Sequence, residues 1–234
     1  MEEKMKVMTL IVFFILFSPS TSFSKGLYGK KYCLKSGFYC LKITKKTSWK
    51  KLFPNRKKRK LVMKLNRLNI RLKKGFILAI PFNTKNKVLI DYSPFPKWIR
   101  APKKKVFIWD PKLLAWAAYA PNGKLLRWGP GVGGKKYCKD VNRSCKTIVG
   151  RFRVIAKGDA KTRSYKYPRG CKGEECTPIP WFIKFHKAGF GIHGSDKIPG
   201  KHASHGCIRV FLDDAKWLNK KFTRYGTKII IRPY

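Results

Sequence analysis

Acidic residues are scarce in this 234-residue chain, which holds 11 Asp and Glu against 55 Lys and Arg and carries a formal net charge of +44. Asp91 is the only acid between Lys25 and Lys105. Such an excess of positive charge predicts a polyanionic neighbourhood, such as nucleic acid, anionic lipid or an acidic cell-wall polymer. Charge alone does not distinguish among these three polyanions. A lysine-rich genome is an alternative source of part of the positive charge.

Long hydrophobic runs are missing after the N-terminus. The single apolar stretch, Val7 to Phe17, follows a basic start and precedes small residues at Ser22 and Ser24. This order is typical of a secretory signal cut near Ser24, and the run is short for a transmembrane helix. Residues 1–24 are therefore predicted to be a signal peptide, with an uncleaved anchor or buried helix as the alternative. The protein is expected to be exported to the periplasm or cell envelope.

A Cys-x-x-Cys pair is also missing, which argues against a common zinc site. Seven cysteines in an exported chain predict disulfides with one thiol left over. Several pairings are possible in principle, but local pairing is the simplest because each pair closes a small loop. The pairs expected on that basis are Cys33 with Cys40, Cys138 with Cys145, and Cys171 with Cys176. Cys207 then stays free, as a nucleophile must.

The pattern of residues 25–84, which follow the predicted signal peptide, indicates a small α+β unit. Residues 39–43 alternate like a strand, and Thr47-Ser48-Trp49 is a capping sequence that opens a helix to Phe53. Residues 59–69 carry apolar side chains at helical spacing, and residues 76–81 form a second strand-like run. Residues 85–105 hold three prolines between charges and are predicted to be a linker.

Short β-type runs separated by turns follow, which predicts a mainly β domain over residues 106–234. Pro121-Asn122-Gly123 is a hairpin signal, and Gly129–Gly134 is predicted to be a β-turn because no Lys-Ser/Thr helix follows it. The expected strands are 106–109, 113–119, 125–128, 151–156, 181–185 and 227–231, with one short helix over 213–220.

Two nearby segments carry the chemistry: Gly191-Ile192-His193-Gly194-Ser195, and Ala203-Ser204-His205-Gly206-Cys207-Ile208-Arg209-Val210. A thiol attacks carbonyls as the thiolate, and a close imidazole is the usual base. Cys207 is the predicted nucleophile and His193 the general base and acid, as a thiolate–imidazolium pair. The alternative is an inert cysteine in a glycine turn. A metal held by the histidines and Cys207 is not expected, because it would occupy the reactive sulfur.

Neighbouring residues receive supporting roles. The backbone N–H groups of Gly206 and Cys207 are predicted to face the substrate's carbonyl oxygen. Ser204 is expected to support the turn, and His205 either supports it or contacts substrate. Arg209 shares a face with Cys207 if the segment is extended, so it clamps a substrate carboxylate or forms a structural ion pair. Trp181 and Phe182 either wall the pocket or belong to the core.

Residues 106–234 resemble the YkuD-type L,D-transpeptidase catalytic domain, and the agreeing pieces occur in order. They are Thr147–Phe152 (with Ile148 where proline is usual), Pro180–Phe182, Gly191–Gly194, Ser204–Arg209, Asp214-Ala215 and Gly226–Ile231. The resemblance implies a β-sandwich with one or two short helices, and a Gly194 carbonyl that orients His193. It also implies peptidoglycan stem tetrapeptides as substrate, a cysteine thioester, 3→3 cross-links, and no cofactor. The loop between His193 and Ser204 is shorter than in many members.

The N-terminal unit is similar to a LysM peptidoglycan-binding module. The matching pieces are Thr47-x-Trp49, Leu52-Phe53, Leu65-Asn66-x-x-Asn69 and Gly75-x-x-Leu78-x-Ile80-Pro81. This likeness implies glycan strands as a partner, and a helical adaptor without glycan affinity is the alternative.

Three readings compete with a cross-linking enzyme. Water in place of an amine gives an L,D-carboxypeptidase, and a cell-envelope protein as acceptor gives an anchoring enzyme. The third reading is a non-catalytic, secreted, cationic cell-wall-binding protein. No specific nucleic-acid partner is expected, since no reader motif is present. A monomer is assumed.

Overall fold

The computed structural model describes residues 27–84 and 87–234, so the predicted signal peptide lies outside the described residues. The N-terminal part has the predicted order of strand, helix, helix and strand. Its elements are β1 (Phe38–Lys42), α1 (Trp49–Leu52), α2 (Arg56–Leu65) and β2 (Ile77–Pro81), after a 3₁₀ helix at Tyr28–Tyr32. β1 and β2 pair antiparallel into a two-stranded sheet.

Side-chain caps explain where the two N-terminal helices begin. Ser48 Oγ accepts a hydrogen bond from the backbone N–H of Lys51 at 3.1 Å, and Asn55 Oδ1 accepts one from Lys58 at 3.0 Å. Each cap satisfies an N–H group that has no partner within its helix. The buried side of α2 carries Val62, which packs with the strands of the two-stranded sheet.

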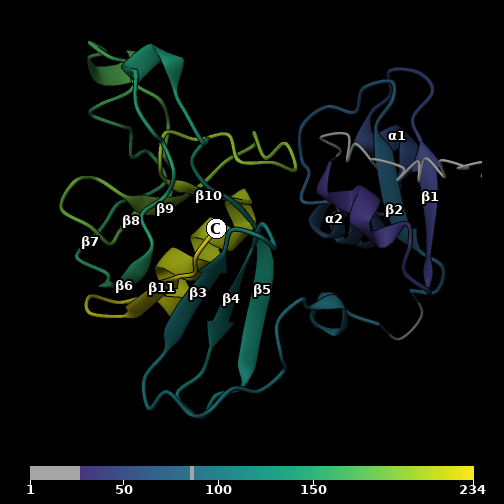
Figure 1. Ribbon diagram of the computed structural model, residues 1–234, viewed down its shortest axis with the longest axis horizontal. Coiled ribbons are helices and arrows are strands. Elements are labelled where there is room, and N and C mark those ends of the chain that lie inside the picture. Colours follow the sequence, from purple (N-terminus) through teal and green to yellow (C-terminus); the bar gives the residue numbers. More distant parts are fainter. Residues whose placement is uncertain (1–26, 85–86) are drawn as a thin grey trace, which may run out of the picture.

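The C-terminal part is built on one nine-stranded sheet (Figure 1). Along the sheet the order is β6-β11-β3-β4-β5-β10-β9-β8-β7. The strands are β3 (Val106–Asp110), β4 (Ala115–Tyr119), β5 (Leu125–Val132), β6 (Gly150–Arg153), β7 (Ala156–Lys157), β8 (Ile183–Lys184), β9 (Gly191–Gly194), β10 (Ile208–Val210) and β11 (Lys228–Ile231). The mainly β prediction is confirmed.

The sheet curls, and its connectivity shows why. β6 and β7 stand at opposite ends of the strand order, yet only Val154 and Ile155 separate them in sequence. The N–H of Val154 bonds Thr227 O at 3.0 Å, and that of Ile155 bonds Lys184 O at 2.9 Å. Because two residues bridge the two ends, both edges must lie close together. The expected two-layer sandwich is thus one continuous sheet folded back on itself.

The glycine-rich segment differs from the predicted β-turn, because β5 runs through it as far as Val132. A Cβ on Gly129 would lie 3.0 Å from the Trp116 ring, and one on Gly131 would lie 3.0 Å from the Trp109 ring. These glycines therefore allow two tryptophans to lie directly against the strand. The pattern indicates close packing, which composition alone does not distinguish from a turn.

One helix packs against the sheet beside β9. α3 (Leu212–Trp217) continues into a π-helical turn, Leu218–Phe222. A Cβ on Gly194 would lie 2.9 Å from the Leu212 side chain, so this glycine lets the helix approach the strand closely. Ala215, Leu218 and Phe222 share a core with apolar residues of β3, β4, β8, β9, β10 and β11.

The N-terminal and C-terminal parts share core side chains and buried ion pairs. Lys64 of α2 lies 2.6 Å from Asp214 Oδ1 of α3, and Arg127 of β5 lies 2.7 Å from the same oxygen. Leu65 packs in one apolar cluster with residues of β3, β4 and β5, joined by Phe95 from the predicted linker. The segment before β3 is therefore packed, and it includes a 3₁₀ helix at Leu89–Tyr92.

Three disulfides close the local loops predicted from the sequence. They join Cys33 to Cys40, Cys138 to Cys145, and Cys171 to Cys176. The disulfide prediction is confirmed, and Cys207 is the free cysteine. Within the described residues, no helix has the length and apolar character required to cross a bilayer.

Candidate active site

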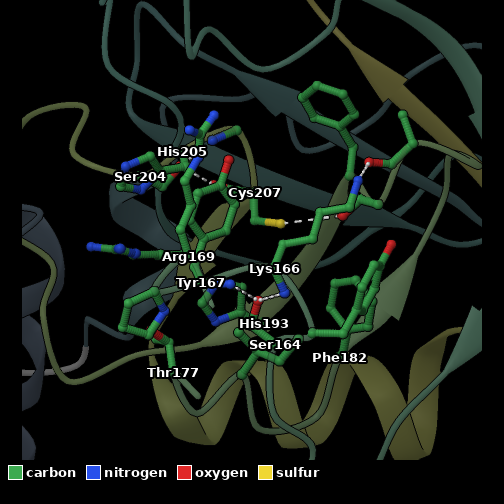
Figure 2. A pocket seen from close by; sticks show the side chains of 18 of the residues that line it. Ser164, Lys166, Tyr167, Arg169, Thr177, Phe182, His193, Ser204, His205 and Cys207 are labelled. Carbon is green, nitrogen blue, oxygen red and sulfur yellow. Dashed lines mark hydrogen bonds between the residues drawn. The ribbon is translucent and has the colours of Figure 1, made fainter. Parts of the chain in front are cut away.

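The register of β9 and β10 brings the two candidate segments together. The strands are parallel, and His193 pairs with Arg209 across them. Cys207 directly precedes β10 and lies two residues before Arg209. In an extended chain this spacing places the two side chains on the same side. Cys207, His193 and Arg209 line one cavity of about 680 Å³ (Figure 2).

His193 is buried and held in one tautomer. Its Nδ1 lies 2.9 Å from the backbone oxygen of Gly194. Because a carbonyl only accepts, Nδ1 must carry the hydrogen, which leaves Nε2 with the lone pair. Burial lowers the pKa of His193 to about 4, and the nearby Arg209 acts in the same direction. A neutral imidazole with a free Nε2 is the form that accepts a proton.

Cys207 is partly exposed in the cavity, and its thiol donates a long hydrogen bond to Gly189 O at 3.6 Å. Burial raises the pKa of Cys207, while the backbone of Gly191 and the charges of Arg209 and Lys166 oppose that rise. Burial thus favours the neutral form of both groups, since it raises the pKa of Cys207 and lowers that of His193. These shifts oppose a preformed thiolate–imidazolium pair, and the pair expected from the sequence stays a prediction.

The turn before Cys207 is fixed by hydrogen bonds on both sides. Ser204 Oγ donates to Cys207 O at 2.6 Å and accepts from the N–H of Gly206 at 3.1 Å. Thr147 Oγ1 donates to Gly206 O at 2.7 Å. Gly206 has φ of +132°, and a Cβ there would lie 2.7 Å from the Phe190 ring. Only glycine fits this position without strain.

The oxyanion prediction requires a correction. The N–H of Gly206 points to Ser204 Oγ and is not free to meet substrate. Among the described residues, the N–H of Cys207 has no hydrogen-bond partner, so it is the donor available in this conformation. The N–H of Gly206 is buried in the turn, where an unpaired N–H would be costly. The buried hydroxyl of Ser204 accepts its hydrogen bond.

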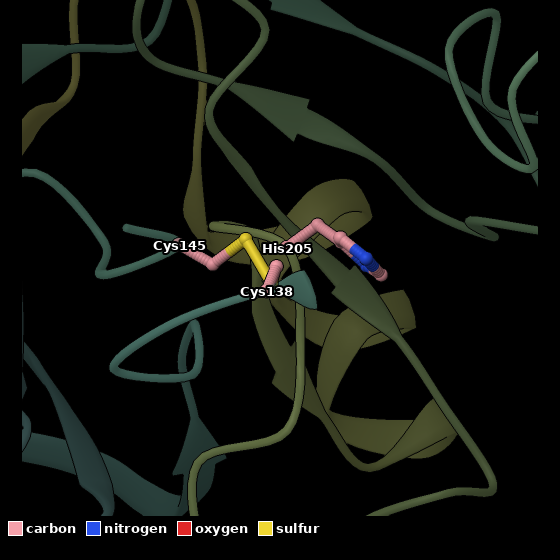
Figure 3. Close-up of side chains that lie close together, drawn as sticks. All are labelled: Cys138, Cys145 and His205. Carbon is pink, nitrogen blue, oxygen red and sulfur yellow. A yellow bond between two sulfur atoms is a disulfide. The ribbon is translucent and has the colours of Figure 1, made fainter. Parts of the chain in front are cut away.

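His205 is held at the cavity wall by its neighbours. Its Nε2 donates to Asp140 Oδ2 at 2.6 Å, and its ring stacks on Tyr167 with 4.5 Å between centroids. This hydrogen bond lowers the pKa of Asp140. His205 also lies beside Cys138 and Cys145 (Figure 3). Their sulfurs are bonded to each other, so they are not thiolate ligands for a metal while that disulfide is closed.

Positive side chains surround the thiol. Arg209 forms no hydrogen bond or short salt bridge with any described residue, but the charge of Asp196 is near enough to oppose the lowering of its pKa by burial, so the structural ion pair considered from the sequence stays an alternative. Three more cations line the cavity: Arg143, Lys166 and Arg169. Asp140, its single acidic lining residue among those described, is taken by His205. The cavity therefore suits a ligand that carries carboxylates.

Trp181 does not line the cavity, contrary to the prediction that it walls the pocket. It packs against the main core, and Lys216 and Lys220 lie over its ring at 5.7 and 5.5 Å. Phe182, for which the same role was considered, does line the cavity. Trp181 has a φ of +59° in the turn before β8, so the alternation of side chains along a strand does not set the direction of its ring.

Two residues at the site went unassigned in the sequence analysis. Thr147 belongs to a recognised motif, but its bond to Gly206 joins positions 59 residues apart. Lys166 affects the pKa of Cys207 from a loop that carries no motif. Neither contact leaves a local signal in the sequence.

Comparisons with known proteins concern the fold and the family. The fold is similar to that of an L,D-transpeptidase from Xylanimonas cellulosilytica, at 22% identity and a TM-score of 0.50, covering 68% of this chain and 73% of that one. Similar structures include L,D-transpeptidases from Stackebrandtia nassauensis (21% identity, TM-score 0.46, covering 62% and 64%) and Mycobacterium smegmatis (20% identity, TM-score 0.44, covering 56% and 59%). The chain spans less than two thirds of the latter two.

No curated protein sequence matches the chain. Residues 104–231, more than half of its length, match the sequence model of the YkuD family. The chain belongs to the family of L,D-transpeptidase catalytic domains.

Proposed function

We propose that this protein is a peptidoglycan L,D-transpeptidase that forms 3→3 cross-links through a thioester on Cys207. One observation carries the proposal. The free thiol opens into a cationic cavity that also contains a buried imidazole, whose Nδ1 is committed to Gly194 O and whose Nε2 is free to act as a base.

Acylation begins when a stem tetrapeptide places the carbonyl of its third residue against Sγ. His193 Nε2 takes the thiol proton as Sγ attacks the carbonyl carbon, and the N–H of Cys207 meets the developing oxyanion. The tetrahedral intermediate then expels terminal D-Ala, whose amine takes the proton from His193. The products of this half-reaction are a thioester on Cys207 and free D-Ala.

Deacylation reverses the proton movement. The side-chain amine of a second stem attacks the thioester carbonyl and gives a proton to His193 Nε2. Sγ leaves as the thiolate and recovers that proton, while a new amide joins the two stems. No ATP is required because the thioester retains the energy of the broken peptide bond. Water or an envelope protein's amine at this step gives hydrolysis or anchoring in place of a cross-link.

Substrate recognition follows from the charge of the cavity. A stem peptide ending in D-Ala carries a terminal carboxylate, and its diamino acid carries another when it is diaminopimelate. Arg209 lines the cavity, makes no short salt bridge with a described carboxylate, and offers a planar fork to one carboxylate of the substrate. Lys166 and Arg169 also line the cavity and provide charge for the second.

We further propose that the N-terminal part binds glycan strands as a LysM-like module. Its support is the order β1, α1, α2, β2 with the two strands paired antiparallel. The matching cellular place is the periplasm or cell envelope, after export by the segment at residues 1–24. The net charge of +44 favours retention near an acidic envelope.

A muropeptide assay tests the catalytic proposal. Purified protein is incubated with disaccharide-tetrapeptides, and products are identified by mass spectrometry. Cross-linked dimers and a tripeptide thioester on Cys207 support the proposal, and Cys207→Ala must abolish both. Tripeptides without dimers indicate hydrolysis. If wild type and Cys207→Ala give the same unreacted substrate, the enzyme proposal is wrong.

A further inference from the structure

The loop that follows His193 is fastened to the N-terminal part of the protein by one residue. Asn69 makes three hydrogen bonds to it. Its Nδ2 donates to Ser195 O at 2.9 Å, its Oδ1 accepts from the N–H of Ile198 at 2.7 Å, and its own N–H donates to Ile198 O at 3.0 Å. Leu68 and Pro199 form an antiparallel bridge beside these bonds.

These bonds lie one peptide unit away from the group that orients the catalytic imidazole. The peptide between Gly194 and Ser195 uses its C=O to hold His193 Nδ1 and its N–H to bond Val210 O at 2.8 Å. The next C=O, that of Ser195, is the one that Asn69 Nδ2 holds. Asn69 therefore fixes the backbone dihedrals of Ser195, and with them the plane that carries Gly194 O.

The anchor itself is rigid. Leu68 and Ile198 are fully buried. Asn66 joins the end of α2 to β2, since its Nδ2 bonds Val62 O and Ala79 O and its Oδ1 accepts from Ala79 N–H, each at 2.8 Å. Because Asn69 is itself held rigidly, its hydrogen bonds keep the loop after His193 in one position. A loop that contacted only solvent would not be held in this way.

We propose that Asn69 is a positioning residue for His193, so that the N-terminal part completes the active site of the C-terminal part. This inference rests on the proposed cysteine chemistry. It also explains why the loop between His193 and Ser204 is short, because this loop packs directly against the connection between α2 and β2. Catalysis then depends on a residue 124 positions before the imidazole.

Asn69→Asp is the sharpest variant, because it keeps the shape and the Oδ1 acceptor but replaces the amide donor at Ser195 O. Asn55→Ala is the matched control, since it removes an exposed helix cap in the same part of the protein. Asn69→Asp is expected to lower kcat for tetrapeptide turnover about 10–100-fold with KM unchanged. Asn55→Ala is expected to leave both unchanged.

A double-mutant cycle with His193→Asn separates positioning from general destabilisation. Its readout is the rate of Cys207 alkylation by iodoacetamide across pH, which needs no substrate. Asn69→Asp is expected to lower the rate at neutral pH in the wild-type background and to change nothing in the His193→Asn background. Equal losses in both backgrounds, or no loss in either, overturn the proposal.

Folding and function are tested separately. Thermal unfolding by circular dichroism must show each variant folded, and Asn69→Ser replaces Asn69→Asp if the carboxylate prevents folding. If wild type fails to turn over muropeptides but the alkylation cycle behaves as expected, the transpeptidase proposal fails while the role of Asn69 stands. If turnover is normal and the alkylation rates of the Asn69 variants match wild type, the role of Asn69 fails alone.

Discussion

Thr147 donates a hydrogen bond from Oγ1 to the carbonyl oxygen of Gly206 at 2.7 Å. The same oxygen of Thr147 accepts from the N–H of Gly134 at 3.1 Å. One hydroxyl thus joins β5's end to the turn that aims Cys207, and it does so in a fully buried position. The peptide that it holds is the one whose N–H belongs to Cys207, the available oxyanion donor.

Thr147→Val is therefore expected to reduce both stability and catalysis. It leaves buried polar groups unpaired, which costs about 1–3 kcal/mol in free energy of unfolding. Thr223→Val is the matched control, because Thr223 Oγ1 makes a buried 2.8 Å bond to Leu218 O away from the cavity. Both variants should lower the denaturation midpoint, and only Thr147→Val should lower kcat. Equal kcat values would contradict the role of Thr147.

Stability should depend on pH through His193. Its pKa is lowered from 6.5 to about 4 in the folded protein by burial. As pH falls from 6.5 towards 4, the unfolded chain gains a proton that the folded protein does not, so stability is lost across that window, by about 3 kcal/mol in total. Urea unfolding should show this loss in wild type and a smaller loss in His193→Asn. Parallel curves would refute it.

Catalysis should persist at lower pH than an ordinary histidine permits. The reaction requires neutral His193, and its pKa in the free protein is about 4. The acid limb of kcat/KM should therefore have its inflection near pH 4, and activity at pH 5.5 should stay close to the plateau. A pH–rate profile of D-Ala release measures it. An inflection near 6.5 would show that the imidazole is more hydrated than its burial indicates.

Arg209 should determine affinity for carboxylate-bearing stems. Charge-assisted hydrogen bonds contribute about 1.5–3 kcal/mol, so Arg209→Ala should lower kcat/KM about 10–150-fold. Arg209→Lys should recover part of the charge but not the fork geometry. Arg151→Ala, an exposed arginine on β6, controls for the change in net charge. A stem analogue with its carboxylates amidated should be insensitive to Arg209→Ala, and sensitivity there would assign Arg209 another role.

The buried ion cluster between α2 and α3 should stabilise the packing of the two parts. Asp214 is fully buried beside Lys64 and Arg127, whereas the neighbouring Asp213 is half exposed. Asp214→Asn leaves a buried Lys64 without its carboxylate and should cost about 3–5 kcal/mol. Asp213→Asn should cost no more than about 1 kcal/mol. Chemical denaturation compares the two, and equal losses would mean that the buried cluster is not paired in solution.

Local features of the fold were predictable because short-range chemistry controls them. The cap at Ser48 begins a helix where the sequence predicts one, and loops of five to seven residues favour the disulfides that form. The second helix begins three residues before the predicted segment, because Asn55 caps it at Arg56. The predicted strand at 125–128 is shorter than β5, because the glycines that follow it are also typical of a turn. Only the tryptophans on neighbouring strands reveal that glycine serves close packing there.

The sequence by itself determined the identity of the reactive groups: the unpaired Cys207, the preceding His193, and the turn that joins Ser204 to Arg209. The tertiary structure decided their states. Segments far apart in the chain bury the thiol and the imidazole, which raises the pKa of Cys207 and lowers that of His193. The fold also directs the N–H of Gly206 to Ser204 and brings Asn69 to the loop after His193. Motifs record residue types over a few positions, whereas desolvation and register depend on every strand and helix that packs around the site.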